Sequence, residues 1–92
     1  MIISFRSRAL KRLWEKDEGR QLPPERLEKI KLFLDRLDAA IEPEAMNTPG
    51  AGFHKLTGYK TARYAVSVSA NWRITFSFAG QDAINVDFED YH

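Results

Sequence analysis

The stretch YAVSVSANWRITFSF at residues 64–78 decides the fold of this chain. On either side of Ala70 and Asn71, apolar and polar side chains alternate with a period of two, which is the pattern of half-buried β-strands. Ala70 and Asn71 can form a tight hairpin turn between the strands, because asparagine tolerates positive φ angles. The stretch therefore predicts an antiparallel hairpin with one apolar face and one polar face.

The alternation continues beyond a second turn at residues 80–82. There the apolar positions are Ile84, Val86 and Phe88. A further strand can form at residues 53–56, after an irregular loop at residues 43–52 that is rich in proline and glycine. The apolar run at residues 2–5 predicts a short first strand. Together these segments predict a mainly antiparallel sheet whose apolar face can receive helices.

Two N-terminal helices are predicted before the hairpin. Ser7 suits the N-cap of a helix that continues to about Glu18 and ends at Gly19. Pro24 suits the first position of a second helix, which ends before Pro43. The apolar residues of the second helix recur at steps of three and four: Leu27, Ile30, Leu34, Leu37 and Ile41. The predicted fold is α+β, with both helices packed on one face of a small, twisted sheet.

Length and composition limit what kind of protein this is. Its 92 residues, 43% of them apolar, suffice for one domain over residues 1–92 with an unaided core. The sequence has no cysteine, which excludes disulfides and thiolate metal ligands and is compatible with a reducing cytoplasm. The first residues are too charged for a signal peptide or a membrane span. We therefore expect a cytoplasmic protein that does not enter a membrane.

Positive charge is concentrated in two segments, although the net charge is only +1. The first segment is residues 1–16, where Glu15 is the single acid, and the second is residues 45–81, which contain no acid. Such segments can offer a positive face to an anion. Solvated surfaces also carry runs of charge, so this pattern alone leaves both interpretations open.

Arg73 is the most informative residue of the predicted polar face. It lies between Trp72 and Ile74 in its strand, so its side chain points to the opposite, polar side. A guanidinium held on a strand can bind a phosphate through two hydrogen bonds. On spacing alone, a cross-strand salt bridge to Asp87 or Glu89 is an equal alternative. Other residues that can converge on the same face are His54, Lys55, Lys60 and Arg63.

The chain closes with DFEDYH, which brings Tyr91 and His92 near Arg73 if the last strand pairs with the Arg73 strand. Terminal residues are often frayed, but histidine is also the side chain best suited to exchange a proton near neutral pH. Cations together with an acid and a base can cleave RNA without a metal, by attack of the ribose 2′-OH. No HxxxH or HExxH spacing indicates a metal site, and we expect no cofactor.

Four segments together resemble the HigB-type toxins of the RelE/ParE-like superfamily: MIISFRSRALKRLWE, PGAGFHKLTG, the hairpin, and VDFEDYH. The resemblance implies a RelE-like fold and a ribosome-dependent endonuclease that cuts mRNA in the decoding site without a metal. It also implies a type II toxin–antitoxin operon. The implied partner is a HigA-like antitoxin with a helix-turn-helix DNA-binding domain.

The resemblance also implies roles for individual residues. Arg73 would stabilise the phosphate and His92 would be the acid–base residue, with Asp90 and Tyr91 supporting substrate placement and protonation. Basic residues of the first helix would contact ribosomal RNA: Arg8, Lys11 and Arg12. The other candidates for binding RNA are those already named from the loop and strand before Arg73: His54, Lys55, Lys60 and Arg63. The active-site lysine of the family falls on Thr57 here, so Lys55 or Lys60 would have to replace it.

Two alternatives remain open on the sequence. One is a ParE-like gyrase inhibitor, which the closing Asp-Tyr-His cluster disfavours. The other is a non-catalytic module that binds RNA or the ribosome through its basic residues, for which His92 would be dispensable.

Overall fold

The computed structural model describes residues 1–90 of the chain. Two α-helices precede a four-stranded sheet with strand order β1-β2-β3-β4, in which all neighbours are antiparallel. The helices are α1 (Arg8–Lys16) and α2 (Leu27–Ala39), and two short 3₁₀ helices are η1 (Pro24–Arg26) and η2 (Pro43–Met46). The strands are β1 (His54–Leu56), β2 (Arg63–Ser67), β3 (Trp72–Ala79) and β4 (Asp82–Asp90). This architecture confirms the predicted α+β fold.

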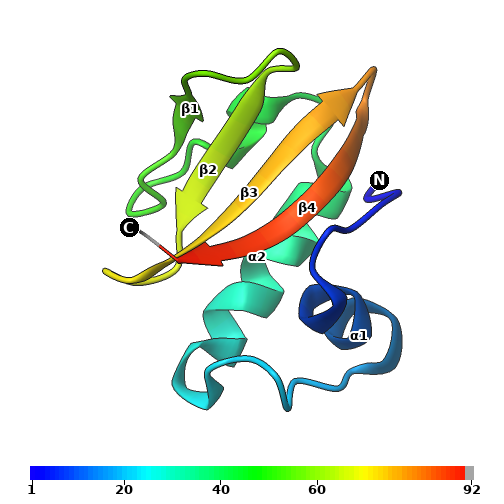
Figure 1. The fold of residues 1–92 in the computed structure, drawn as a ribbon, viewed down its shortest axis with the longest axis vertical. Coiled ribbons are helices and arrows are strands. Elements are labelled where there is room, and N and C mark those ends of the chain that lie inside the picture. Colours follow the sequence, from blue (N-terminus) through cyan, green and yellow to red (C-terminus); the bar gives the residue numbers. More distant parts are fainter. Residues whose placement is uncertain (91–92) are drawn as a thin grey trace.

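The helices cover one face of the sheet and leave the other open. In Figure 1, α2 crosses behind β3 and β4, α1 lies alongside α2, and the open face of the sheet is toward the viewer. Apolar side chains from both helices and from three strands form one core, because each element buries its apolar stripe against the others. Core residues include Leu10 and Leu13 of α1, Ile30, Leu34 and Leu37 of α2, and Val66, Ile74, Phe76 and Val86 of the sheet.

Both helices are shorter than predicted. The Ser7 side chain caps α1 as expected, since its Oγ accepts a hydrogen bond from the Leu10 N–H at 3.1 Å. However, α1 ends at Lys16 rather than at about Glu18, because Asp17 adopts the left-handed conformation (φ 54°) that ends a helix. A side chain at Gly19 would instead collide with Leu27, since an added Cβ would lie 2.7 Å from Leu27 Cδ2.

The second helix differs from its prediction at both ends. Pro24 begins the 3₁₀ helix η1, and the α-helical part begins only at Leu27. The helix ends at Ala39, with Ala40 extended as its C-cap. Ile41 therefore lies beyond the apolar stripe and is 61% exposed, so its predicted place in the core was wrong. Within residues 1–90, neither helix has the length and apolar run needed to cross a bilayer.

The N-terminal segment and the hairpin turn also differ from the predictions. Residues 2–5 form isolated parallel bridges from Ile2 and Phe5 to β4, rather than a strand of their own. At the β2–β3 turn, Asn71 does not use a positive φ angle. The Ser69 hydroxyl holds the turn instead, by accepting hydrogen bonds from the N–H groups of Asn71 and Trp72.

A β-bulge at Asn85 changes which side chains of β4 face the core. The pairing with β3 shifts between Thr75, opposite Asp87, and Ser77, opposite Ile84, so β4 contains one extra residue there. Asn85 has a φ of 53°, which asparagine tolerates better than most residues. Cross-strand partners point to the same face, so Ile84 lies on the face of Ser77. Its predicted place on the apolar face was wrong.

Candidate functional site

The open face of the sheet carries a cluster of charged and hydroxyl side chains from β2, β3 and β4. Register places Arg73 opposite Ser67 on one side and Glu89 on the other, and places Thr75 opposite Asp87. Because partners across antiparallel strands share a face, these side chains gather on the side away from the helices. We call this surface the polar face; it consists of Arg63, Arg73, Thr75, Ser77, Asp87 and Glu89.

Arg63 is a buried member of the polar face and does not reach its surface. Its side chain is only 2% exposed, and Nη2 donates hydrogen bonds to Thr75 Oγ1 at 2.9 Å and to the carbonyl oxygen of Asn85 at 2.7 Å. Nη1 donates to Ser77 Oγ at 3.3 Å. The expectation that Arg63 contacts RNA directly is corrected, because the long side chain lies across β3 toward the bulge of β4 and its charge is buried.

The environment of Arg63 acts on its ionisation in two directions. Burial lowers the pKa of the Arg63 guanidinium, and the nearby charge of Arg6 lowers it further. The negative charges of Glu89 and Asp87, with a smaller contribution from Tyr59, raise it. Arginine stays protonated in proteins, so a buried positive charge lies directly under the surface of the polar face.

Arg73 and Glu89 form an ion pair on the polar face. Arg73 Nη2 lies 3.4 Å from Glu89 Oε1, and the two side chains are 20% and 25% exposed. The Thr75 hydroxyl donates to the other carboxylate oxygen, Glu89 Oε2. The cross-strand alternative considered for Arg73 is therefore confirmed. A guanidinium has five N–H donors, so this contact is also compatible with binding of a phosphate.

The end of β4 lies beside the Arg73–Glu89 pair. Asp90 is the register partner of Trp72, so it lies one residue beyond Glu89 and on the opposite face of the strand from Arg73. The structure therefore does not place the Asp90 side chain on the polar face with Arg73. Tyr91 and His92, the other predicted catalytic residues, lie outside the described residues.

The structure separates the predicted RNA-binding residues around β1. His54 is the partner of Ala65 and so lies on the side of the polar face, whereas Lys55 is the partner of Tyr64 and lies on the other side. His54 Nδ1 lies 2.9 Å from the Gly52 carbonyl oxygen. A carbonyl only accepts hydrogen bonds, so Nδ1 carries the proton and Nε2 of a neutral ring can accept one. Lys60 is exposed in the loop after β1.

The basic residues of α1 form a surface of their own. Arg8, Lys11 and Arg12 are exposed on the side of the helix away from the buried Leu10 and Leu13. The helix packs on the opposite side of the sheet from the polar face (Figure 1). The structure therefore does not bring these three cations together with Arg73, and any role in binding RNA is separate from the polar face.

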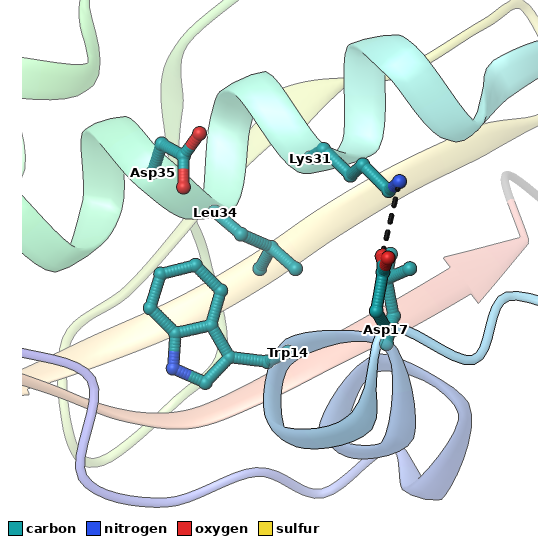
Figure 2. Close-up of a pocket in the computed structure, with 6 residues that line it drawn as sticks. Trp14, Asp17, Lys31, Leu34 and Asp35 are labelled. Atoms are coloured by element: carbon teal, nitrogen blue, oxygen red, sulfur yellow. Dashed lines mark ion pairs between the residues drawn. The ribbon is translucent and has the colours of Figure 1, made fainter.

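A groove of about 290 Å³ lies between α1 and α2, away from the polar face. Figure 2 shows Trp14 and Leu34 in this groove, with an ion pair between Lys31 Nζ and Asp17 Oδ1 at 3.1 Å. None of the predicted site residues lines it. Within residues 1–90, no group of three or more histidine or carboxylate side chains is arranged to hold a metal ion.

A comparison with known proteins identifies the family. The profile described as "RelE-like toxin of type II toxin-antitoxin system HigB" matches residues 3–92, which is nearly the whole chain. This chain belongs to the HigB-like toxins. It is also 37% identical over 92 residues to "Endoribonuclease HigB" of Proteus vulgaris, and the alignment covers 100% of both chains. The resemblance of the four sequence segments is confirmed, and membership of a type II toxin–antitoxin system implies an antitoxin partner.

In this HigB-like toxin, sequence reasoning missed the hydroxyl groups of the polar face. Thr75 connects Arg63 to the Arg73–Glu89 pair, and Ser77 accepts a hydrogen bond from Arg63, yet neither hydroxyl was singled out. The signal was present in the sequence, because Thr75 and Ser77 lie two and four residues after Arg73 in the same strand, and such positions share a face. The contribution of Asn85 could not be found in the same way, since it depends on the carbonyl that the bulge presents to Arg63.

Proposed function

We propose that this HigB-like toxin is an endoribonuclease that cuts translated mRNA on the ribosome by acid–base attack of the ribose 2′-OH. The observation that carries the proposal is the Arg73–Glu89 pair on the open face of the sheet, held over the buried Arg63 and next to the end of β4. It offers a positioned guanidinium on β3 beside β4, the strand that precedes Tyr91 and His92 in the sequence. The full-length match to an enzyme named as an endoribonuclease supports the same reading.

The proposed reaction needs a base, a cation and an acid. The base takes the proton from the 2′-OH, whose oxygen attacks the adjacent phosphorus to give a 2′,3′-cyclic phosphate. Arg73 stabilises the negative charge on the phosphorane oxygens. The bond from phosphorus to the 5′-oxygen breaks, and His92 gives a proton to that oxygen. Tyr91 supports placement of the substrate, and Asp90, whose side chain lies on the opposite face of β4 from Arg73, contributes only at the exposed end of the strand.

His54 is suited to the role of base. It lies on the side of the polar face, two strands from Thr75, which corresponds to about 10 Å at the usual strand spacing. With Nδ1 donating to the Gly52 carbonyl oxygen, Nε2 is the nitrogen that accepts a proton. Of the two lysines considered as substitutes for the family lysine, Lys60 is the better placed, because Lys55 lies on the other side of β1.

The proposal gives the separate basic surface of α1 a function in binding. Arg8, Lys11 and Arg12 contact ribosomal RNA, since exposed cations on one helix face suit the phosphate backbone. The enzyme then acts in the cytoplasm, where translated mRNA is present. The antitoxin partner is a HigA-like protein with a helix-turn-helix DNA-binding domain.

The proposal is tested by incubating the purified toxin with a defined mRNA alone and with the same mRNA on translating ribosomes. We expect cleavage only in the presence of ribosomes, with products ending in a 2′,3′-cyclic phosphate, and no loss of cleavage when EDTA-treated toxin is used. A parallel assay with gyrase and plasmid DNA separates the alternatives. Altered supercoiling of the plasmid together with intact mRNA would indicate a gyrase inhibitor. Ribosome binding without cleavage of the mRNA would indicate a non-catalytic binding module.

A further inference from the structure

A continuous chain of hydrogen bonds links the buried Arg63 to Arg73. Arg63 Nη2 donates to Thr75 Oγ1 at 2.9 Å, Thr75 Oγ1 donates to Glu89 Oε2, and Glu89 Oε1 accepts from Arg73 Nη2 at 3.4 Å. The chain runs from β2 through β3 to β4 and back to β3. We infer that Arg63 and Thr75 are positioning residues that fix the guanidinium of Arg73 by way of Glu89. This inference rests on the proposed role of Arg73.

The chemistry of the groups gives the chain one direction. Arginine can only donate hydrogen bonds, so the Thr75 oxygen must accept one from Arg63. The single hydroxyl hydrogen of Thr75 is then donated in a hydrogen bond to Glu89. An ionised carboxylate can only accept hydrogen bonds, so Glu89 accepts one from Thr75 on one oxygen and one from Arg73 on the other. The Thr75 hydroxyl therefore joins the buried guanidinium to the Glu89 carboxylate, and the Glu89 carboxylate is held in contact with Arg73.

Burial restricts Arg63 and Thr75 to an indirect role. Arg63 is 2% exposed and Thr75 is fully buried, so neither can contact an RNA strand on the surface. Arg63 is itself fixed at its far side by the Asn85 carbonyl oxygen of the bulge, at 2.7 Å. The uncharged Thr75 can therefore act on catalysis only through the groups that it contacts, and these lead to Arg73 by way of Glu89.

A double-mutant cycle tests this inference with the full-length toxin on programmed ribosomes. Thr75→Val keeps the shape of the side chain and removes the hydroxyl. We expect it to lower the single-turnover cleavage rate by about 10- to 100-fold, the loss typical of a small misplacement of a catalytic group, while ribosome affinity stays within about twofold. Thr75→Ser should recover most of the rate. In an Arg73→Ala background, Thr75→Val should cause no further loss.

A second measurement does not depend on cleavage. The NMR order parameter of the Arg73 Nε–Hε bond should be high in the wild type, near the value of about 0.85 for rigid groups, and should fall toward about 0.6 in Thr75→Val. Glu89→Gln, at a half-buried position on the same path, provides the same test if Thr75→Val does not fold. If the wild type cuts no RNA, the proposed function fails while this measurement still decides the positioning role.

Two results would overturn the inference. The first is an Arg73 bond that stays equally rigid in folded Thr75→Val or Glu89→Gln. The second is an equal fold-loss from Thr75→Val in the wild-type and Arg73→Ala backgrounds, since independent effects on the rate multiply.

Discussion

Replacing Arg73 with alanine is expected to lower the single-turnover rate of mRNA cleavage by about 10²- to 10³-fold, the cost of removing one strong donor to a charged transition state. The phosphorane carries more negative charge than the bound phosphate, so the loss should appear in the rate and not in affinity for the programmed ribosome. The measurement is the rate of mRNA cleavage with toxin in excess over ribosomes.

Two variants control the Arg73 experiment. Arg73→Lys keeps the positive charge and loses the planar guanidinium, so its cleavage rate should lie between those of the wild type and Arg73→Ala. Arg26→Ala removes an exposed arginine of η1 that is not part of the polar face, and it should leave the rate unchanged. If Arg73→Ala cuts within about twofold of the wild type, the guanidinium does not stabilise the transition state.

Replacing His92 with glutamine is expected to lower the cleavage rate by about 10²- to 10⁴-fold, the usual contribution of general acid–base catalysis. Glutamine keeps a hydrogen-bonding side chain of similar length, but it cannot give a proton to the leaving 5′-oxygen. A general acid must carry its proton to act and the base must have lost its proton, so the wild-type rate should follow a bell-shaped pH profile whose alkaline fall reports the acid. The variant should lack this alkaline fall.

A modified substrate separates an acid role of His92 from a merely structural one. With sulfur in place of the bridging 5′-oxygen, the leaving group is a thiolate, which departs without protonation. The defect of His92→Gln should then largely disappear, while that of Arg73→Ala should persist. An undiminished defect of His92→Gln on the sulfur substrate would contradict the assignment of His92 as the acid.

Much of the fold could be predicted because it follows from local periodicity. The alternation around Trp72 fixes the hairpin, and the capping residue Ser7 fixes the start of α1. The bulge at Asn85 could not be predicted in this way, because one extra residue in β4 leaves the polar–apolar pattern looking regular while it reverses the face of Ile84. The exposed Ile41 shows the same limit, since periodicity alone does not say where a helix ends.

The candidate site was predictable to the extent that it depends on strand alternation. Arg73 lies on the polar face as expected, and its partner Glu89 was one of two acids named for that position. The burial of Arg63 was not predictable, because a long side chain can point into solvent or lie across its own sheet. Its direction is decided by Thr75, Ser77 and the Asn85 carbonyl, which come from distant parts of the sequence.

The central claim is that the polar face directs the ribose 2′-OH at the neighbouring phosphate. The most direct test uses ribosomes programmed with two mRNAs that differ by a single atom, the 2′-oxygen of the nucleotide 5′ to the cleaved bond. We expect the ribose form to be cut and the 2′-deoxy form to stay intact at that bond, with both bound equally well. Cleavage of the 2′-deoxy form at the same bond and at a similar rate would contradict the account.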